Sequence, residues 1–301
     1  MLIDDLRPPV PYPQPWPPRR WWPPIEPYAI TGARSWWGAA YAALPGWREL
    51  QLDVHVPVAA AGPVPCVIWV HGGGFETGAR WRSPLQWPQR VQFGKMLAAG
   101  LAVATIDYRH AAEDPDRLGC VRDTRAAIRY VRHHAAHFGI DPARLGIWGE
   151  SAGGYLAAFA GLLGDGPSHV PGTDLLGDEG VEDESSALTA VADWYGVHDL
   201  TTMLSAADAA RTGLTRAQLW ASSPLAHVTP QAPPFFLVHG LEDRTVPFAQ
   251  SDALHAALVE AGADSTLIGI PGADHVFAGV DPLPLMDQTI AWLAQMLGAG
   301  A

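Results

Sequence analysis

The residues best suited to chemistry in this sequence are a serine, an aspartate and a histidine in three separate segments. The serine, Ser151, lies in the G-x-S-x-G pattern Gly149-Glu150-Ser151-Ala152-Gly153. An apolar stretch precedes this pattern and an alanine-rich stretch follows it, which predicts a strand, a tight turn and a helix. Only glycine fits beside the serine in such a turn, which holds the hydroxyl above the edge of a sheet. We interpret Ser151 as a nucleophile and expect Glu150 to support the site through hydrogen bonds.

A serine hydroxyl needs a base to remove its proton, and the base needs a carboxylate to orient it. Asp243 follows the apolar stretch 235–238, and His275 follows the stretch 265–270. Because the carboxyl ends of parallel strands meet at one edge of a sheet, both residues are expected beside Ser151. The order serine, acid, histidine along the chain is the one expected for a nucleophile in this kind of turn.

Two neighbouring carboxylates compete with Asp243 for the role of orienting acid. Glu242 is adjacent to it in the chain and is expected to point elsewhere. Asp274 is adjacent to His275 and is badly placed to reach the Nδ1 atom of that ring. We therefore predict Ser151, Asp243 and His275 as the catalytic residues.

A His-Gly-Gly-Gly-Phe run at residues 71–75 follows the apolar stretch 64–70. Glycines let a backbone approach a substrate closely, so that its N–H groups can bind a developing oxyanion. We predict that Gly73, Gly74 and Ala152 donate these N–H groups. His71 is expected to fix the loop through hydrogen bonds, and Gly72 to support it.

The remaining histidines do not predict a metal site. His133 and His137 have the i, i+4 spacing of a helical ligand pair, but no Glu or Cys accompanies them at a useful position. His239 follows a strand, where structural hydrogen bonding is the expected role. We expect neither a metal nor a cofactor.

Several stretches of the chain carry the patterns of strands and helices that could position these loops. The expected strands alternate with expected helices, which indicates an α/β fold with a mostly parallel central sheet and helices on both faces. We predict strands at residues 49–56, 64–70, 101–106, 145–148, 187–195, 235–238 and 265–270, and helices at residues 86–99, 120–138, 152–163, 248–261 and 285–297.

We predict a catalytic domain at residues 49–301, with an N-terminal arm at residues 1–48 packed on it. The arm is rich in proline, which limits regular structure, and in tryptophan, which is unlikely to stay in water. Small insertions are expected near residues 164–186, which are rich in Gly, Asp, Glu and Ser, and near residues 199–222. Either the arm or these insertions could border the active site.

The bulk properties of the sequence exclude several classes of protein. The 301 residues are 48% hydrophobic and 17% charged, which is enough for a large core. The net charge of −12 disfavours nucleic acid as a partner. We see no membrane span and no secretory signal, and expect Cys66 and Cys120 to be free thiols. These features predict a cytoplasmic protein, and they leave open whether it forms a homo-oligomer.

Four motifs together resemble those of a known group of enzymes. HGGGF, GESAGG, HGLEDRTVP and GADHVF are similar to motifs of the microbial esterases related to hormone-sensitive lipase, within the α/β-hydrolase superfamily. The segments 106–109, 139–145 and 223–228 look more like the bacterial feruloyl and acetyl-xylan esterase-like branch. The resemblance covers roughly residues 50–297 and implies an α/β-hydrolase fold, an acyl-enzyme mechanism and no cofactor.

The resemblance implies a carboxylic ester hydrolase, and the aromatic residues suggest short-chain or aryl esters. An amidase or peptidase that acts on aryl formamides or prolyl peptides is an alternative with the same site. A non-catalytic small-molecule receptor on the same fold is a second alternative, although such proteins usually lose a member of the triad.

Overall fold

The computed structural model describes residues 30–44, 48–84, 86–110, 118–166, 174–175 and 177–299. Most of the predicted N-terminal arm, including Trp16, Trp21, Trp22 and Trp47, lies outside these residues. Part of the predicted insertion at 164–186 also lies outside them.

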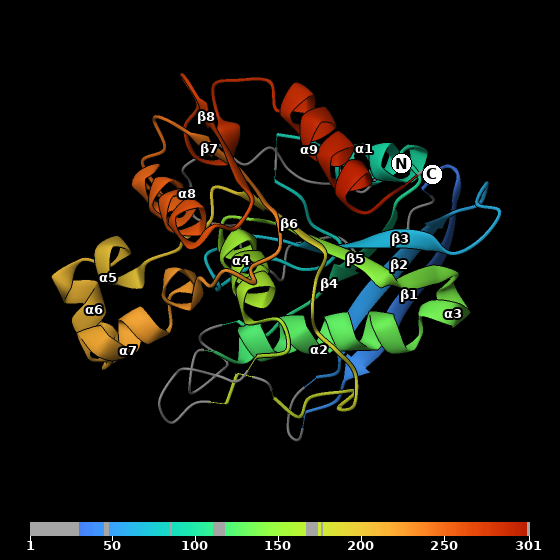
Figure 1. Ribbon diagram of the computed structural model, residues 1–301, viewed down its shortest axis with the longest axis horizontal. Coiled ribbons are helices and arrows are strands. Elements are labelled where there is room, and N and C mark those ends of the chain that lie inside the picture. The colour runs from blue at the N-terminus through green and yellow to red at the C-terminus, as the bar shows by residue number, and fades with distance from the viewer. Residues whose placement is uncertain are drawn as a thin grey trace, which may run out of the picture.

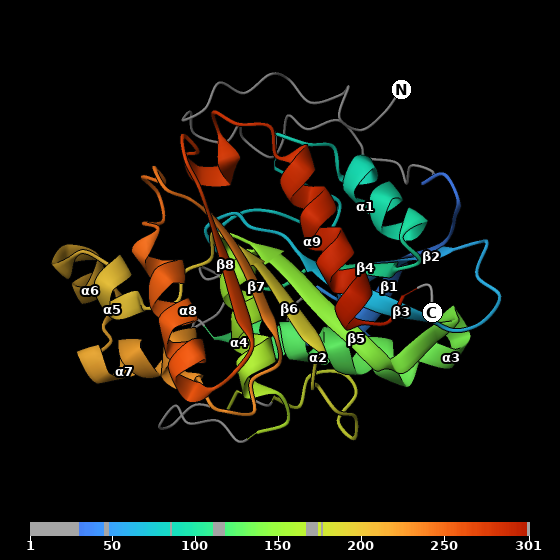
Figure 2. The same cartoon turned by 45° about the horizontal axis from the view of Figure 1, so that its top comes forward.

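Among the described residues, eight strands form one twisted sheet that runs through the centre of the molecule (Figures 1 and 2). The strand order is β1-β2-β4-β3-β5-β6-β7-β8. β2 runs antiparallel to both of its neighbours, and the strands from β4 to β8 are parallel. The strands are β1 (Ala33–Ala42), β2 (Leu50–Pro57), β3 (Val64–Val70), β4 (Ala102–Ile106), β5 (Ile140–Glu150), β6 (Ala190–Trp194), β7 (Phe235–Gly240) and β8 (Ser265–Ile270).

The central strands are buried on both faces, as their continuous apolar sequences predict. Every residue of β4 and β6, and nearly every residue of β3, is buried. Seven of the eight strands correspond to predicted ones. The exception is β1, because little regular structure was expected before residue 49, and that expectation was wrong for residues 33–42.

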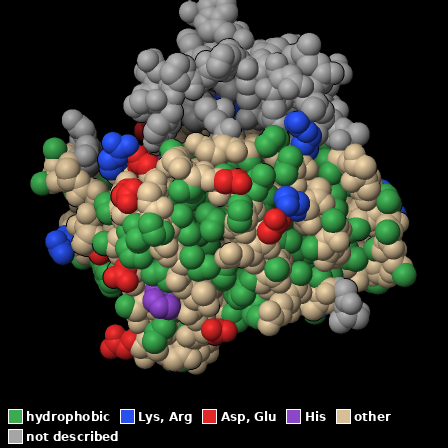
Figure 3. Space-filling model, turned by 90° about the horizontal axis from the view of Figure 1, so that it is seen from above, with side chains coloured by type: hydrophobic (Ala, Val, Ile, Leu, Met, Phe, Trp, Pro, Cys, Tyr) green, Lys and Arg blue, Asp and Glu red, His purple; other side chains and the backbone are tan. Residues whose placement is uncertain are grey.

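Helices cover both faces of the sheet, as predicted. α1 (Gln89–Ala98) and α9 (Leu283–Met296) pack on one face, through Phe93, Met96 and Ile290 among others. Figure 3 views the molecule from this side, where charged side chains are scattered among hydrophobic ones. The opposite face carries α2 (Gly119–His133), α4 (Ala152–Leu163) and α8 (Ala249–Ala261), and α3 (Ala135–Phe138) continues beyond α2.

Three short helices form a separate group beside α8, which we call the cap (Figures 1 and 2). It occupies the predicted insertion at residues 199–222 and consists of α5 (Leu200–Met203), α6 (Ala206–Thr212) and α7 (Arg216–Ala221). Asp199 accepts a hydrogen bond from the Thr201 N–H at the start of α5. Thr215 and Gln218 form a capping box at the start of α7. The short 3₁₀ helix η4 (Pro224–His227) follows the cap.

The described part of the other insertion runs along α2, and we call residues 177–187 the strap. Four arginines on one face of α2, at i, i+3, i+7 and i+10, hold the strap and the residues just before it. Arg122 and Arg125 donate to the carbonyls of Asp174 and Leu175, Arg125 also donates to that of Gly164, and Arg129 and Arg132 donate to those of Glu179, Val181, Ser185 and Ala187.

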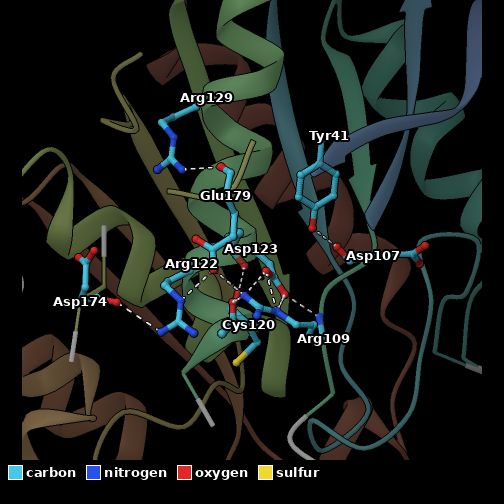
Figure 4. Close-up of polar contacts among 11 residues, drawn as sticks. Tyr41, Asp107, Arg109, Cys120, Arg122, Asp123, Arg129, Asp174 and Glu179 are labelled. Carbon is cyan, nitrogen blue, oxygen red and sulfur yellow. Dashed lines mark hydrogen bonds and ion pairs between the residues drawn. The ribbon is translucent and has the colours of Figure 1, made fainter. Parts of the chain in front are cut away.

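One side chain of the strap also enters a buried network at the start of α2 (Figure 4). Oε1 of Glu179 accepts hydrogen bonds from Arg109 at 2.8 Å and from Arg122 at 2.9 Å. Arg109 in turn pairs with the buried Asp123. The strap is mostly exposed or half-buried and is fixed at its two buried residues, Glu179 and Ser186.

Several smaller predictions concern single residues. Cys66 in β3 and Cys120 in α2 are free and buried, as predicted. His133 contacts Glu184, and the ring of His137 packs near Trp36. Within the part of the chain that the structure describes, no helix combines the length and apolar character needed to cross a membrane.

Candidate active site

The turn after β5 holds Ser151 in a backbone conformation that non-glycine residues rarely adopt. Its φ is 54° and its ψ is −119°. A Cβ atom on Gly149 would collide with the carbonyl of Gly153, and one on Gly153 would collide with the carbonyl of Val70. These close approaches require glycine on both sides of the serine, as the sequence pattern predicts.

The structure brings together the three residues that were predicted as catalytic. The Oγ atom of Ser151 lies 3.0 Å from Nε2 of His275. Nδ1 of the same ring lies 2.7 Å from Oδ2 of Asp243. His275 and Asp243 are both buried, so water competes little for these hydrogen bonds.

Asp243 is held by several donors besides His275. Its Oδ1 accepts hydrogen bonds from the backbone N–H groups of Thr245 and Val246, at 2.9 and 2.8 Å. Nε2 of His239 also lies 3.4 Å from Oδ2. Burial would raise the pKa of the Asp243 carboxyl, but the bonds from His239 and His275 outweigh burial and hold this pKa well below its usual range. Asp243 is therefore a stable carboxylate at neutral pH.

The two competing carboxylates are engaged elsewhere. Glu242 accepts a hydrogen bond from the Gly272 N–H at 3.0 Å. Asp274 accepts a hydrogen bond from the backbone N–H of His275, not from its ring, and forms an ion pair with Arg244. Their contacts agree with the preference for Asp243.

The glycine-rich loop after β3 lies against the serine turn. Gly72 donates its N–H to Oε1 of the buried Glu150 at 2.5 Å. The carbonyl oxygen of Gly73 accepts hydrogen bonds from the N–H groups of Glu76 and Thr77, which close a tight turn. No described residue accepts a hydrogen bond from the N–H of Gly73 or Gly74.

The N–H of Ala152 is available for a different reason. Ala152 is the first residue of α4, and the first N–H groups of a helix have no acceptor within the helix. The positive end of the α4 dipole therefore lies next to the serine hydroxyl, where it favours negative charge.

His71 and Glu150 support this loop through buried contacts. The ring of His71 stacks on Tyr108 with centroids 4.4 Å apart, and its Nδ1 donates to the Gly72 carbonyl at 2.7 Å. Burial lowers the pKa of His71 to about 4, so its ring is neutral at pH 7. Burial also raises the pKa of Glu150, although the Gly72 N–H and the nearby His275 oppose this.

Strained backbone concentrates in the loops around these residues. The described non-glycine residues with positive φ are Phe75, Ser151, Tyr195, Val276 and Phe277. Each follows the end of β3, β5, β6 or β8, at the edge where parallel strands end. Such clustering is typical of functional sites, where the surrounding structure enforces uncommon conformations.

Sequence reasoning missed several residues that shape this region. Tyr195 packs its ring 5.0 Å from that of His275. His198 forms a buried pair with Asp193 at 2.7 Å, behind the first turn of α4. Tyr155 lies one helical turn beyond Ser151, and that spacing was the one sequence signal that could have indicated it.

Comparison with known proteins finds esterases among the similar sequences. The chain is 32% identical over 251 residues to esterase LipQ of Mycobacterium tuberculosis, an alignment that covers 77% of this chain and 55% of LipQ. It is 28% identical to the probable carboxylic ester hydrolase LipM of the same organism, over 68% of this chain and 46% of LipM. The chain thus spans about half the length of these two relatives.

Similar structures align over more of their length. A truncated carbohydrate esterase from gut microbiota superposes with a TM-score of 0.79 and 27% identity, covering 90% of this chain and 99% of that one. Thermogutta terrifontis esterase 2 with bound propionate gives a TM-score of 0.73 and 26% identity, covering 90% and 97%. These likenesses and the strand order identify the α/β-hydrolase fold. Because the profile of the BD-FAE family also matches residues 52–258, more than half of the sequence, the chain belongs to the BD-FAE family.

Proposed function

We propose that this protein is a serine carboxylesterase in which Ser151 is the nucleophile, His275 the general base and Asp243 the orienting acid. The observation that carries the proposal is the continuous hydrogen-bonded chain from the Ser151 hydroxyl through both nitrogens of His275 to the Asp243 carboxylate. The relatives that are named esterases support the same reaction.

In the first half of the reaction, His275 removes the Ser151 proton while Oγ attacks the ester carbonyl carbon. Asp243 stabilises the imidazolium that forms, since it is a carboxylate bonded to Nδ1. The carbon–oxygen bond to the alcohol then breaks, and the alcohol takes the proton from Nε2. This leaves an acyl group on Ser151 and a neutral His275.

In the second half, water replaces the alcohol. His275 removes a proton from the water, which attacks the acyl carbon and displaces Oγ of Ser151. The proton returns to the serine oxygen, and the acid product leaves. During both halves, the N–H groups of Gly73, Gly74 and Ala152 bind the oxyanion, and the loss of one such donor typically lowers turnover by about 10²–10³-fold.

We propose short-chain or aryl esters as the substrates. A similar esterase has propionate bound, which is the acid that a short acyl group releases, and another is a carbohydrate esterase. Phe75, a half-buried aromatic residue in the glycine-rich loop, offers a flat apolar surface to a short acyl or aryl group.

The test is hydrolysis of p-nitrophenyl acetate by the wild type and by Ser151→Ala. We expect kcat/KM to fall by at least about 10³-fold in this variant. A fluorophosphonate probe should label the wild type at Ser151 and should not label the variant. Retention of more than about a tenth of the activity would exclude Ser151 as the nucleophile, and a wild type that neither hydrolyses esters nor reacts with the probe would favour a receptor.

A matched pair of variants tests the acid. Asp243→Asn should lower kcat by about 10²–10⁴-fold, because the amide no longer stabilises the imidazolium. Asp274→Asn, which changes the carboxylate next to His275 in the chain, should retain most of the activity. Equal losses in both variants would contradict the role of Asp243.

A separate assay tests which bond is cleaved. An aryl formamide and an aminoacyl anilide are assayed beside the ester, and faster hydrolysis of either would reveal an amidase.

A further inference from the structure

Tyr155 connects the predicted nucleophile to two other elements. It lies on α4 one turn beyond Ser151, and its backbone N–H donates to the Ser151 carbonyl at 3.1 Å. Its side chain is only 3% exposed. The ring and the hydroxyl make separate contacts, one with the glycine-rich loop and the other with the cap.

The ring of Tyr155 packs against the residue that ends the glycine-rich loop. It meets the Phe75 ring edge-on, with centroids 5.2 Å apart and planes at 84°. Phe75 has a φ of 62°, which is uncommon for a bulky side chain and persists only when packing enforces it. Because Phe75 directly follows Gly73 and Gly74, the packing that holds it also fixes the direction of their N–H groups.

The hydroxyl of Tyr155 binds the end of the cap. It donates a buried hydrogen bond of 2.7 Å to the carbonyl of Ser222, the residue that terminates α7. Burial raises the pKa of Tyr155 well above its usual value, so the hydroxyl stays protonated and remains a donor.

Within the part of the chain that the structure describes, the cap is also attached by a few other polar contacts: Nε2 of His227 donates to the Ala221 carbonyl at 2.8 Å, and Gln250 of α8 donates to Thr202 Oγ1 at 3.0 Å. Its two ends are joined at the base, where the Leu225 N–H donates to the His198 carbonyl and the Leu200 N–H donates to Ser223 Oγ. Leu219 is the one buried side chain described between residues 200 and 221. A segment with so little buried apolar surface opens at low free energy unless it is anchored.

We propose that Tyr155 is a positioning residue with two separable roles. Its ring holds Phe75, and through it the N–H groups of Gly73 and Gly74. Its hydroxyl holds the end of α7 and thereby the cap, which we expect to contact substrates that extend beyond a small acyl group. The kinetic part of this proposal rests on the proposed esterase function.

The two roles predict different kinetic effects. Interactions made with the oxyanion act on the transition state, so a disturbed loop lowers kcat for every ester. Contacts between the cap and an extended substrate contribute to binding, so a released cap raises KM mainly for large esters.

The experiment compares Tyr155→Phe, Tyr155→Leu and Phe75→Leu on p-nitrophenyl acetate and p-nitrophenyl hexanoate. Tyr155→Phe keeps the ring and loses the hydroxyl, and should raise KM for the hexanoate by about 3–10-fold and for the acetate by a smaller factor. Tyr155→Leu and Phe75→Leu should each lower kcat for both esters by about 10-fold or more.

Phe159→Leu is the matched control, because Phe159 is the next aromatic residue along the same face of α4 and its ring packs on Tyr155 with centroids 5.3 Å apart. It should lower the melting temperature while kcat stays close to the wild-type value. If Phe159→Leu lowered kcat as much as Tyr155→Leu, the ring would be ordinary core packing. If Tyr155→Phe changed KM equally for both esters or for neither, the role of the hydroxyl would be refuted.

Hydrogen exchange measured by mass spectrometry tests the same proposal without any activity. Tyr155→Phe should speed exchange in the peptide that covers α7 but not in the one that covers residues 72–77, whereas Tyr155→Leu should speed both. Unchanged exchange in both peptides would overturn the proposal. Since Phe75 is only half-buried, Phe75→Leu replaces Tyr155→Leu if the latter fails to fold. An inactive wild type would count against the esterase function alone.

Discussion

Gly72→Ala is a perturbation whose cost can be worked out from a single steric contact. A Cβ atom at position 72 would lie 2.5 Å from Oε1 of Glu150 and 2.7 Å from its Cδ. The φ of Gly72 lies outside the positive range, so alanine is compatible with the backbone. The whole penalty therefore comes from the buried carboxylate, which must move by roughly 1 Å to reach ordinary van der Waals contact.

That movement has two costs. Overpacking a buried position typically costs about 1–3 kcal/mol. Displacing the carboxylate also breaks its 2.5 Å hydrogen bond from the Gly72 N–H, and hydrogen bonds to charged groups contribute about 1.5–3 kcal/mol. We therefore expect Gly72→Ala to reduce the free energy of unfolding by about 3–5 kcal/mol.

A second substitution should relieve the clash. Glu150→Ala removes the carboxylate that Cβ would meet, so the double variant should be at least about 1–2 kcal/mol more stable than the sum of the two single changes predicts. Urea unfolding followed by tryptophan fluorescence measures all four proteins. Gly73→Ala is the control, because its φ is 124° and its Cβ would meet the Thr77 carbonyl, so Glu150→Ala cannot rescue it. Additive free energies in the Gly72 cycle would show that Glu150 is not the obstacle.

Two further predictions concern buried titratable side chains in and around β2. Arg80 pairs with the buried carboxylates of Asp53 and Asp107 at 2.9 and 2.7 Å. Arg80→Met should reduce the free energy of unfolding by about 3–5 kcal/mol, because it removes the ion pair of Asp53 and leaves Asp107 only its 3.3 Å pair with the half-exposed Arg48. Adding Asp53→Asn should restore part of that stability in chemical denaturation, and no recovery would refute the explanation. Burial lowers the pKa of His55 from 6.5 to about 4. Between these pH values, His55 binds a proton in the unfolded chain but not in the folded chain. The free energy of unfolding should therefore fall by up to about 3 kcal/mol as the pH drops through this range. Melting temperatures from pH 7 to pH 4 should fall less steeply for His55→Gln, and parallel curves would contradict this assignment.

The sheet was largely predictable because its central strands are buried on both faces and have continuous apolar sequences. β1 was missed for a physical reason. Its pairing with β2 shifts register between Trp36 and Ala39 and again between Ala40 and Ala42, so its sequence has no regular alternation. β5 begins at Ile140, earlier than the predicted residue 145. Asp141-Pro142 looks like a chain break in the sequence, but the structure accommodates it as an irregularity in the pairing of β5 with β3.

Some residues of the candidate site could be predicted from the sequence and others could not. The pattern around Ser151 could be predicted because a side chain at Gly149 or Gly153 would collide with the backbone. The choice of Asp243 over Glu242 and Asp274 rested on expected loop geometry, and their hydrogen bonds agree with it. The contacts of Tyr155 with Phe75 and Ser222 join segments far apart in the chain, and no local pattern in the sequence encodes such pairings.

The strap along α2 is held mainly through its backbone. Arg125, Arg129 and Arg132 donate to carbonyl oxygens of residues 164–187, and every amino acid supplies such an oxygen. Glu179 and Ser186 are exceptions, since their side chains accept hydrogen bonds from arginines. The course of this segment is thus encoded in the helix beneath it, and most of its own residues could be exchanged without rerouting the chain. Related proteins could therefore vary the outer surface of this segment freely while the spacing of the arginines stays fixed.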